Sequence, residues 1–99
     1  AISRKNTVSF KDGMVVSNEP GYYEKDNFGI RIENLVYVKK NNFHNLTMAP
    51  IDKELIDCKI LDNKEKNWIN NYHKKVYSNL KRFMDKKDVL ELKNACSVI

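Results

Sequence analysis

The 99-residue sequence contains little of what builds flexible linkers, disulfide frameworks or membrane spans. It has three glycines, two prolines and two cysteines, and its uninterrupted apolar runs are only a few residues long. So few turn formers leave little room for long linkers, and such short apolar runs exclude a membrane-spanning helix. The two cysteines, Cys58 and Cys96, lie far apart and have no zinc-binding spacing. We therefore expect free thiols in a reducing cytosol.

The net charge is positive, but the sequence has no strongly basic cluster. Lys plus Arg number 18 against 13 for Asp plus Glu, and the excess of +5 is spread over both halves of the chain. Proteins that bind nucleic acids usually gather their positive charge into a patch. We therefore expect a solvated surface with no nucleic-acid partner. A basic nucleic-acid-binding or interaction module remains as an alternative.

The composition and the first residues bear on the class of protein. Hydrophobic residues make up 41% of the chain and charged residues 31%, which is typical of a folded domain. The chain opens with Ala-Ile-Ser, without an initiator methionine or a secretory signal. We therefore expect a cytoplasmic protein with no membrane partner, and a piece of a longer chain.

Residues 1–51 are predicted to be rich in strands. Residues 14–19 favour a strand because they are rich in β-branched side chains, and Pro20-Gly21 is predicted to end it. Residues 22–29 are interpreted as a loop. Residues 30–39 carry the clearest alternation in the sequence. Weaker strand signals lie at 7–10 and 46–51. His44 is predicted to lie in a turn.

Residues 52–99 are predicted to be mainly helical. Asp62 followed by Glu65 has the spacing of a capping box that begins a helix. The residues that follow at helical spacing are predicted to form one apolar core stripe: Trp68, Tyr72, Val76, Leu80 and Phe83. A break is expected at 85–87. A short last helix capped by Asp88 is expected to carry Val89, Leu92 and Cys96.

The most informative feature is the pair Glu19 and Glu33. If residues 14–19 and 30–39 pair antiparallel, partner numbers sum to about 52, and Glu19 then faces Glu33. Two ionised carboxylates in that position repel unless they share a proton or bind a divalent cation, for which Mg²⁺ or Mn²⁺ is suited. A slightly different register would instead leave both as solvated residues. Arg31, on the same face, either orients a metal-bound carboxylate or forms a simple surface ion pair.

Two stretches, residues 17–24 (Ser-Asn-Glu-Pro-Gly-Tyr-Tyr-Glu) and 28–34 (Phe-Gly-Ile-Arg-Ile-Glu-Asn), closely resemble the end of the catalytic domain of aminopeptidase P. That family of Xaa-Pro aminopeptidases belongs to the pita-bread metallopeptidases. The segment at 62–73 looks like the cytosolic eukaryotic form. The resemblance implies an α+β fold: the C-terminal portion of a pita-bread domain, with a metal-ligand hairpin at 14–39 inside a strand-rich part, 1–51. A helical part of the same domain, 52–99, would follow.

The resemblance also implies a chemistry. Glu19 matches the family's glutamate that ligates one metal and shuttles a proton, and Glu33 matches the glutamate that bridges both metals. Two divalent ions are implied, Mn²⁺ by expectation and Zn²⁺ as the alternative. The family's other ligands, two aspartates and a histidine, are absent from this chain, so we expect the chain alone to be inactive and to bind metal weakly. His44 and His73 match no ligand: His44 is predicted to lie on the surface, His73 to pack or cap.

The implied substrates are peptides with proline in the second position, and the implied parent protein is a homodimer. A prolidase of the same fold, which cleaves Xaa-Pro dipeptides only, is the alternative within the enzyme class.

Overall fold

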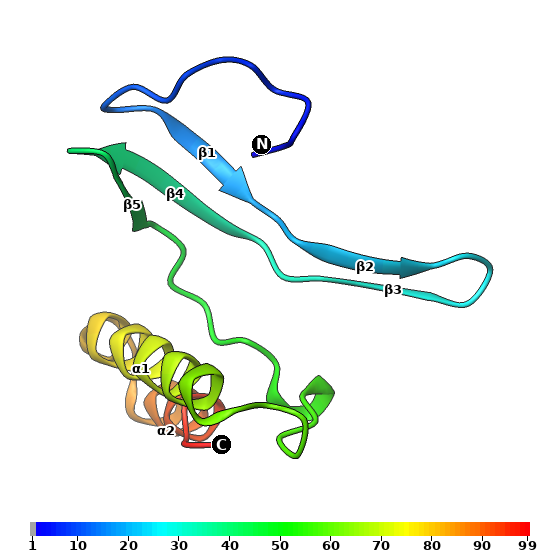
Figure 1. The fold of residues 1–99 in the computed structure, drawn as a ribbon. Helices are drawn as coiled ribbons and strands as arrows, with labels where there is room; N and C mark the ends of the chain where they lie inside the picture. The colour runs from blue at the N-terminus through cyan, green and yellow to red at the C-terminus, as the bar shows by residue number, and fades with distance from the viewer. Residues whose placement is uncertain (1) are drawn as a thin grey trace. The chain divides into compact units, whose positions relative to one another are not determined.

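The computed structural model describes residues 2–99, which form two compact units that divide after Thr47. The first unit holds the strands and the second the helices (Figure 1). The strands are β1 (Val15–Asn18), β2 (Gly21–Glu24), β3 (Phe28–Arg31), β4 (Asn34–Lys39) and β5 (Asn42–Asn45). The helices are α1 (Asn63–Leu80) and α2 (Lys86–Ala95), with short 3-10 helices η1 (Lys53–Leu55) and η2 (Lys81–Phe83).

The first four strands form one long antiparallel hairpin that is interrupted once. β1 pairs with β4 from Val15↔Tyr37 to Asn18↔Asn34, and β2 pairs with β3 from Gly21↔Arg31 to Glu24↔Phe28. Partner numbers sum to the same value in both ladders, so the predicted register is confirmed. The interruption falls at Pro20, which has no amide hydrogen to donate to the ladder.

The prediction of a loop at 22–29 is therefore wrong. Those residues form β2 and β3, and the chain reverses in a tighter turn at Asp26, whose φ is 59°. Two tyrosines, a phenylalanine and an isoleucine are good strand formers, and they continue the hairpin beyond the proline. Pro20 interrupts the hydrogen-bonded ladder without ending the pairing, since the amide of Ile32 still donates to its carbonyl at 3.2 Å.

The last strand of the first unit also differs from the prediction. β5 begins directly after a turn whose residues Lys40 and Asn41 both have positive φ, of 50° and 60°. Such a two-residue turn connects the two strands of a hairpin directly, so the second strand begins at the residue after the turn. The strand therefore lies at Asn42–Asn45 rather than at 46–51, and no strand forms at 7–10. In the three-stranded sheet, in the order β1-β4-β5, the buried side chains are Val36 and Val38 of β4.

The second unit has a small core of its own, built from Tyr72, Val76 and Leu92, with partly buried neighbours around them. The predicted capping box is confirmed: the amide of Glu65 donates to Asp62 Oδ1 at 2.8 Å, and the amide of Asp62 donates to Glu65 Oε2 at 2.9 Å. Within residues 2–99, neither α-helix is long and apolar enough to cross a bilayer.

Two expectations for the helices are wrong in part. The apolar stripe is not buried along its whole length, because Trp68 and Phe83 are 59% and 74% exposed. α1 ends at Leu80, and the following 3-10 turn carries Phe83 away from the buried face. The last helix is capped by Asp85, not by Asp88, because the carboxylate of Asp85 accepts the amide of Asp88 three residues on.

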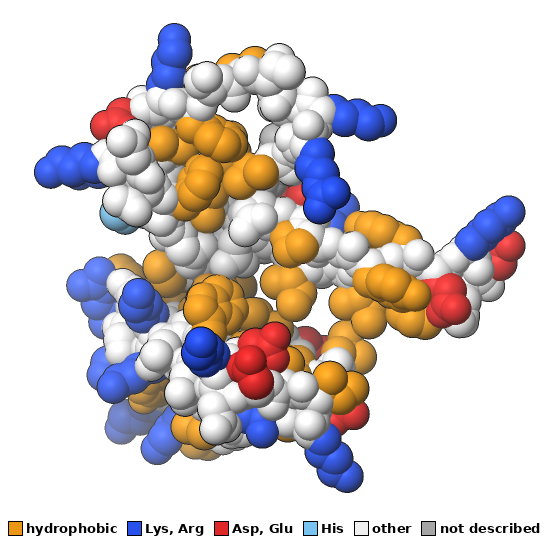
Figure 2. Space-filling view, in the orientation of Figure 1, with side chains coloured by type: hydrophobic (Ala, Val, Ile, Leu, Met, Phe, Trp, Pro, Cys, Tyr) orange, Lys and Arg blue, Asp and Glu red, His pale blue; other side chains and the backbone are white. Residues whose placement is uncertain are grey.

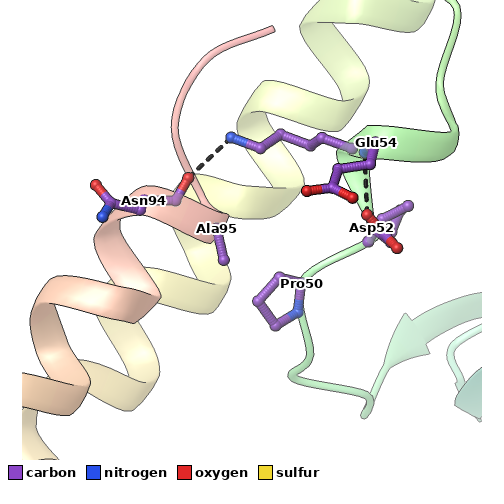
Figure 3. Close-up of a pocket in the computed structure, with 7 residues that line it drawn as sticks. Pro50, Asp52, Glu54, Asn94 and Ala95 are labelled. Carbon is purple, nitrogen blue, oxygen red and sulfur yellow. Dashed lines mark hydrogen bonds between the residues drawn. The ribbon is translucent and has the colours of Figure 1, made fainter.

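The segment before the helices is tied to them by long-range hydrogen bonds. The hydroxyl of Tyr72 donates to the carbonyl of Ala49 at 2.8 Å, and the amide of Ile51 donates to His73 Nε2 at 3.0 Å. Lys53 Nζ donates to the carbonyl of Asn94 at 2.9 Å, at the end of α2 (Figure 3). These bonds fix residues 49–53 against both helices.

Candidate metal centre

The interruption in the hairpin places Glu19 opposite Glu33. Both lie between the ladder that ends at Asn18↔Asn34 and the one that begins at Gly21↔Arg31. Cross-strand partners, and residues two apart along a strand, point to the same face of a hairpin. Glu19 and Glu33 therefore share a face with Arg31, as the register predicts.

Arg31 brings the two carboxylates together. Its Nη1 lies 3.8 Å from Glu19 Oε2, and its Nη2 lies 3.5 Å from Glu33 Oε2. The hydroxyl of Ser17 donates to the other oxygen of Glu19 at 3.2 Å. One guanidinium thus offsets the repulsion between two like charges.

The carboxylates keep oxygens free for a further partner. Both contacts with Arg31 exceed the 2.7–3.2 Å of an ordinary N–H···O hydrogen bond. The Glu19 and Glu33 side chains are 31% and 43% exposed, so water and ions reach them. Such hard oxygens suit Mg²⁺ or Mn²⁺, and the pair therefore fits part of a dication site.

Two carboxylates are fewer ligands than a complete site needs. Among residues 2–99 no group of three or more His, Cys, Asp or Glu side chains could hold a metal ion. Glu19 and Glu33 therefore fit at most a part of a metal site, and Arg31 is the cation that lies between them. This is the set that the sequence singled out.

The histidines and cysteines do not join the glutamates. His44 is exposed, as predicted, but it lies in β5 rather than in a turn, and its ring stacks on Tyr37 with centroids 4.9 Å apart. His73 is fully buried, so its predicted packing role is confirmed. Both cysteines are free thiols, and burial raises the pKa of the Cys96 thiol.

A separate hollow of about 490 Å³ lies in the second unit (Figure 3). Its lining comes from residues 50–54 and from Asn94 and Ala95. The carboxylate of Asp52 already accepts the amide of Glu54 at 3.0 Å, which begins η1. The carboxylate of Asp52 and the ammonium group of Lys53 thus stabilise the local fold around this hollow.

The family of the chain follows from comparison with known proteins. Residues 40–99 match the model for the C-terminal region of peptidase M24, and residues 1–40 match the model for metallopeptidase family M24. The chain belongs to metallopeptidase family M24. The resemblance noted in the sequence is thereby confirmed, and the fold is the α+β fold of the C-terminal part of a pita-bread domain.

Individual members of the M24 family show the same similarity. A probable Xaa-Pro aminopeptidase P of Coprinopsis cinerea is 48% identical, over 73% of this chain and 14% of the relative. Aminopeptidase P2 of Arabidopsis thaliana is 37% identical, over 81% of this chain and 13% of the relative. The chain thus spans only a small part of the relatives it matches.

A solved M24 structure is similar along nearly the whole chain. The X-prolyl aminopeptidase of Caenorhabditis elegans is described as a cytosolic enzyme with a di-nuclear active site. It is 30% identical, with a TM-score of 0.76, and the similarity covers 98% of this chain and 18% of that one.

Proposed function

We propose that this chain is the C-terminal part of an aminopeptidase that removes the N-terminal residue from peptides with proline in the second position. The observation that carries the proposal is the convergence of Glu19 and Glu33 on Arg31 in an M24 hairpin. The names of the relatives give the substrate class. A family built on metal-dependent hydrolysis accounts for two opposed carboxylates that would otherwise only repel.

Glu19 and Glu33 would hold two divalent ions, for which we expect Mn²⁺, with Zn²⁺ as the alternative. When bound, such ions supply Lewis-acid activation of the attacking water and of the peptide carbonyl. Glu19 has a second role in this proposal. Its ionised carboxylate accepts the proton of the attacking water and passes it to the proline nitrogen as the peptide bond breaks. The guanidinium of Arg31 would keep both carboxylates turned to one face.

The setting of the enzyme is part of the same proposal. The Caenorhabditis elegans neighbour is described as cytosolic. We accordingly place the protein in the cytoplasm. The proposal also includes a homodimer, with peptides rather than nucleic acids or membranes as partners. Because residues 2–99 supply two carboxylates and no larger ligand cluster, the chain by itself is expected to show no turnover with Mn²⁺ and an Xaa-Pro peptide.

The test is a Glu33→Gln substitution in the full-length protein that contains this chain. The amide keeps the shape of the side chain but loses the charge that a dication needs. We expect Mn²⁺ binding to weaken and hydrolysis of an Xaa-Pro-Yaa tripeptide to fall by about 10²–10³-fold or more, as when one preorganised electrostatic group is lost.

Glu24→Gln is the matched control. Glu24 lies on the same hairpin and is exposed, and its carboxylate accepts a hydrogen bond from the side chain of Asn27. It should leave both measurements unchanged. Full activity in Glu33→Gln would refute the proposal, and cleavage of Xaa-Pro dipeptides alone would identify a prolidase instead.

A further inference from the structure

Ser17 lies in β1, two residues before Glu19, so both side chains point to the same face of the hairpin. Its hydroxyl donates to Glu19 Oε1 at 3.2 Å. The other oxygen of that carboxylate, Oε2, lies 3.8 Å from Nη1 of Arg31. The two oxygens of Glu19 thus face different partners: Oε1 faces the hydroxyl on β1, and Oε2 faces the guanidinium.

Glu19 lies where the hairpin leaves the packed part of the sheet. Val36 of β4 is 8% exposed, and Ser17 on the neighbouring strand is half-buried. Beyond Pro20, every residue of β2 and β3 is exposed, and Figure 2 shows apolar side chains uncovered along this part of the hairpin. Ser17 therefore contacts the Glu19 carboxylate from the better-packed side.

The backbone of Ser17 is held on both edges of β1. On one edge Ser17 pairs with Leu35 in the ladder between β1 and β4. On the other edge its carbonyl accepts the amide of Ile2 at 3.1 Å. A serine hydroxyl is joined to the backbone through a single carbon, so a fixed backbone leaves the oxygen only the few staggered positions of one torsion angle.

The Arg31 guanidinium is a weaker constraint on Glu19. Its side chain is 52% exposed, and its 3.8 Å contact with Glu19 is longer than an ordinary hydrogen bond. Exposed ion pairs of this kind do little to fix a long side chain. The bond from Ser17 is shorter and comes from a short side chain on a paired strand. It therefore determines the orientation of the Glu19 carboxylate more closely than the ion pair does.

We propose that Ser17 is a positioning residue for Glu19. Its hydroxyl holds Oε1 on the β1 side, which leaves Oε2 directed toward the side of Arg31 and Glu33. Hydrogen bonds to a ligating carboxylate orient it for the metal, and their loss costs about 10–100-fold in metal affinity or activity. This inference rests on the proposed function, because a fixed orientation of Glu19 matters only if Glu19 is a metal ligand.

The experiment compares Ser17→Val with Ser17→Thr in the full-length protein that contains this chain, with Mn²⁺ binding measured by calorimetry. The two new side chains have nearly the same shape, and both suit a strand, but only threonine keeps the hydroxyl. Ser17→Val should raise the dissociation constant for Mn²⁺ about tenfold. Ser17→Thr should bind as the unchanged protein does. Equal affinity in the two variants, whether tight or weak, would overturn the inference.

Ser9→Val is the control, because it removes a hydroxyl from an exposed residue outside the strands. It should bind Mn²⁺ as tightly as the unchanged protein. The same titrations separate positioning from folding, since the number of sites per chain reports the folded fraction and the dissociation constant reports the affinity of the folded sites. A Ser17→Val variant with fewer sites at an unchanged dissociation constant would also contradict the positioning role.

The two proposals fail in distinguishable ways. If Glu33→Gln binds Mn²⁺ as tightly as the unchanged protein does, the metal centre itself is wrong. If Glu33→Gln loses Mn²⁺ while Ser17→Val keeps it, only the positioning role is wrong.

Discussion

The two units divide stability and chemistry between them. The helical unit buries Tyr72, Val76 and Leu92 in a core of its own. The strand unit carries Glu19, Glu33 and Arg31, yet every residue of β2 and β3 is exposed. The β2–β3 part of the hairpin thus rests on backbone pairing and on the contact between the rings of Tyr22 and Phe28 rather than on a buried core. The predictions below test this division.

The largest effect is expected from the core of the helical unit. Leu92 is 6% exposed and Leu90, two residues away on α2, is 60% exposed. Leu92→Ala should lower the free energy of unfolding by about 2–5 kcal/mol because it leaves a cavity. Leu90→Ala should change it by less than about 1 kcal/mol. Urea unfolding followed by the fluorescence of Trp68, the single tryptophan and a residue of α1, provides the measurement. Equal losses in the two variants would mean that this unit has no separate core.

A smaller, pH-dependent effect is expected from His73. Burial, and then the nearby charge of Lys53, lower the pKa of His73 below the ordinary 6.5. The amide of Ile51 donates to Nε2, and this bond needs the unprotonated nitrogen. Below about pH 6.5 the unfolded chain therefore binds a proton that the folded chain does not. Stability should be complete above that pH and should fall as the pH drops toward the lowered pKa, by at most ~1.4 kcal/mol per pH unit.

Urea midpoints between pH 7.5 and pH 5, again followed by Trp68, measure this loss. His73→Gln should remove the part of the slope that comes from the histidine. His44→Gln, which alters an exposed residue of the strand unit, should keep the full slope. A slope that is unchanged in His73→Gln would show that other groups cause the pH dependence.

Local rules explain what the sequence predicted well. The hairpin register follows from matching apolar positions in 14–19 and 30–39, since a shift by one residue would turn every side chain to the other face. The capping box follows from two residues three positions apart. The placement of Glu19 opposite Glu33 follows from the register alone, so the sequence is sufficient to predict it.

The remaining features depend on contacts that spacing does not encode. Pro20-Gly21 is typical of the end of a strand, yet β2 begins directly after the proline, so the prediction of a loop at 22–29 was wrong. The two tyrosines directly after the proline are good strand formers, and they are the signal that could have predicted this continuation. The exposure of Trp68 and Phe83, and the bond from Ile51 to His73, depend on how segments far apart in sequence pack.

The smallest effect is expected at the start of α1. Asp62→Ala removes the hydrogen bond that the side chain of Asp62 accepts from the amide of Glu65. It should lower the free energy of unfolding, measured through Trp68 fluorescence, by about 1 kcal/mol. Glu91→Ala, at an exposed position inside α2, should change this free energy by less than about 0.5 kcal/mol.

The strand unit can be followed separately through hydrogen exchange at the amide of Val38, which donates to the carbonyl of Met14 at 2.9 Å. That exchange rate should not change in Asp62→Ala if the two units are stabilised independently. A faster exchange at Val38, in step with the loss at α1, would instead show that the cap of the helix also stabilises the hairpin that carries the candidate ligands.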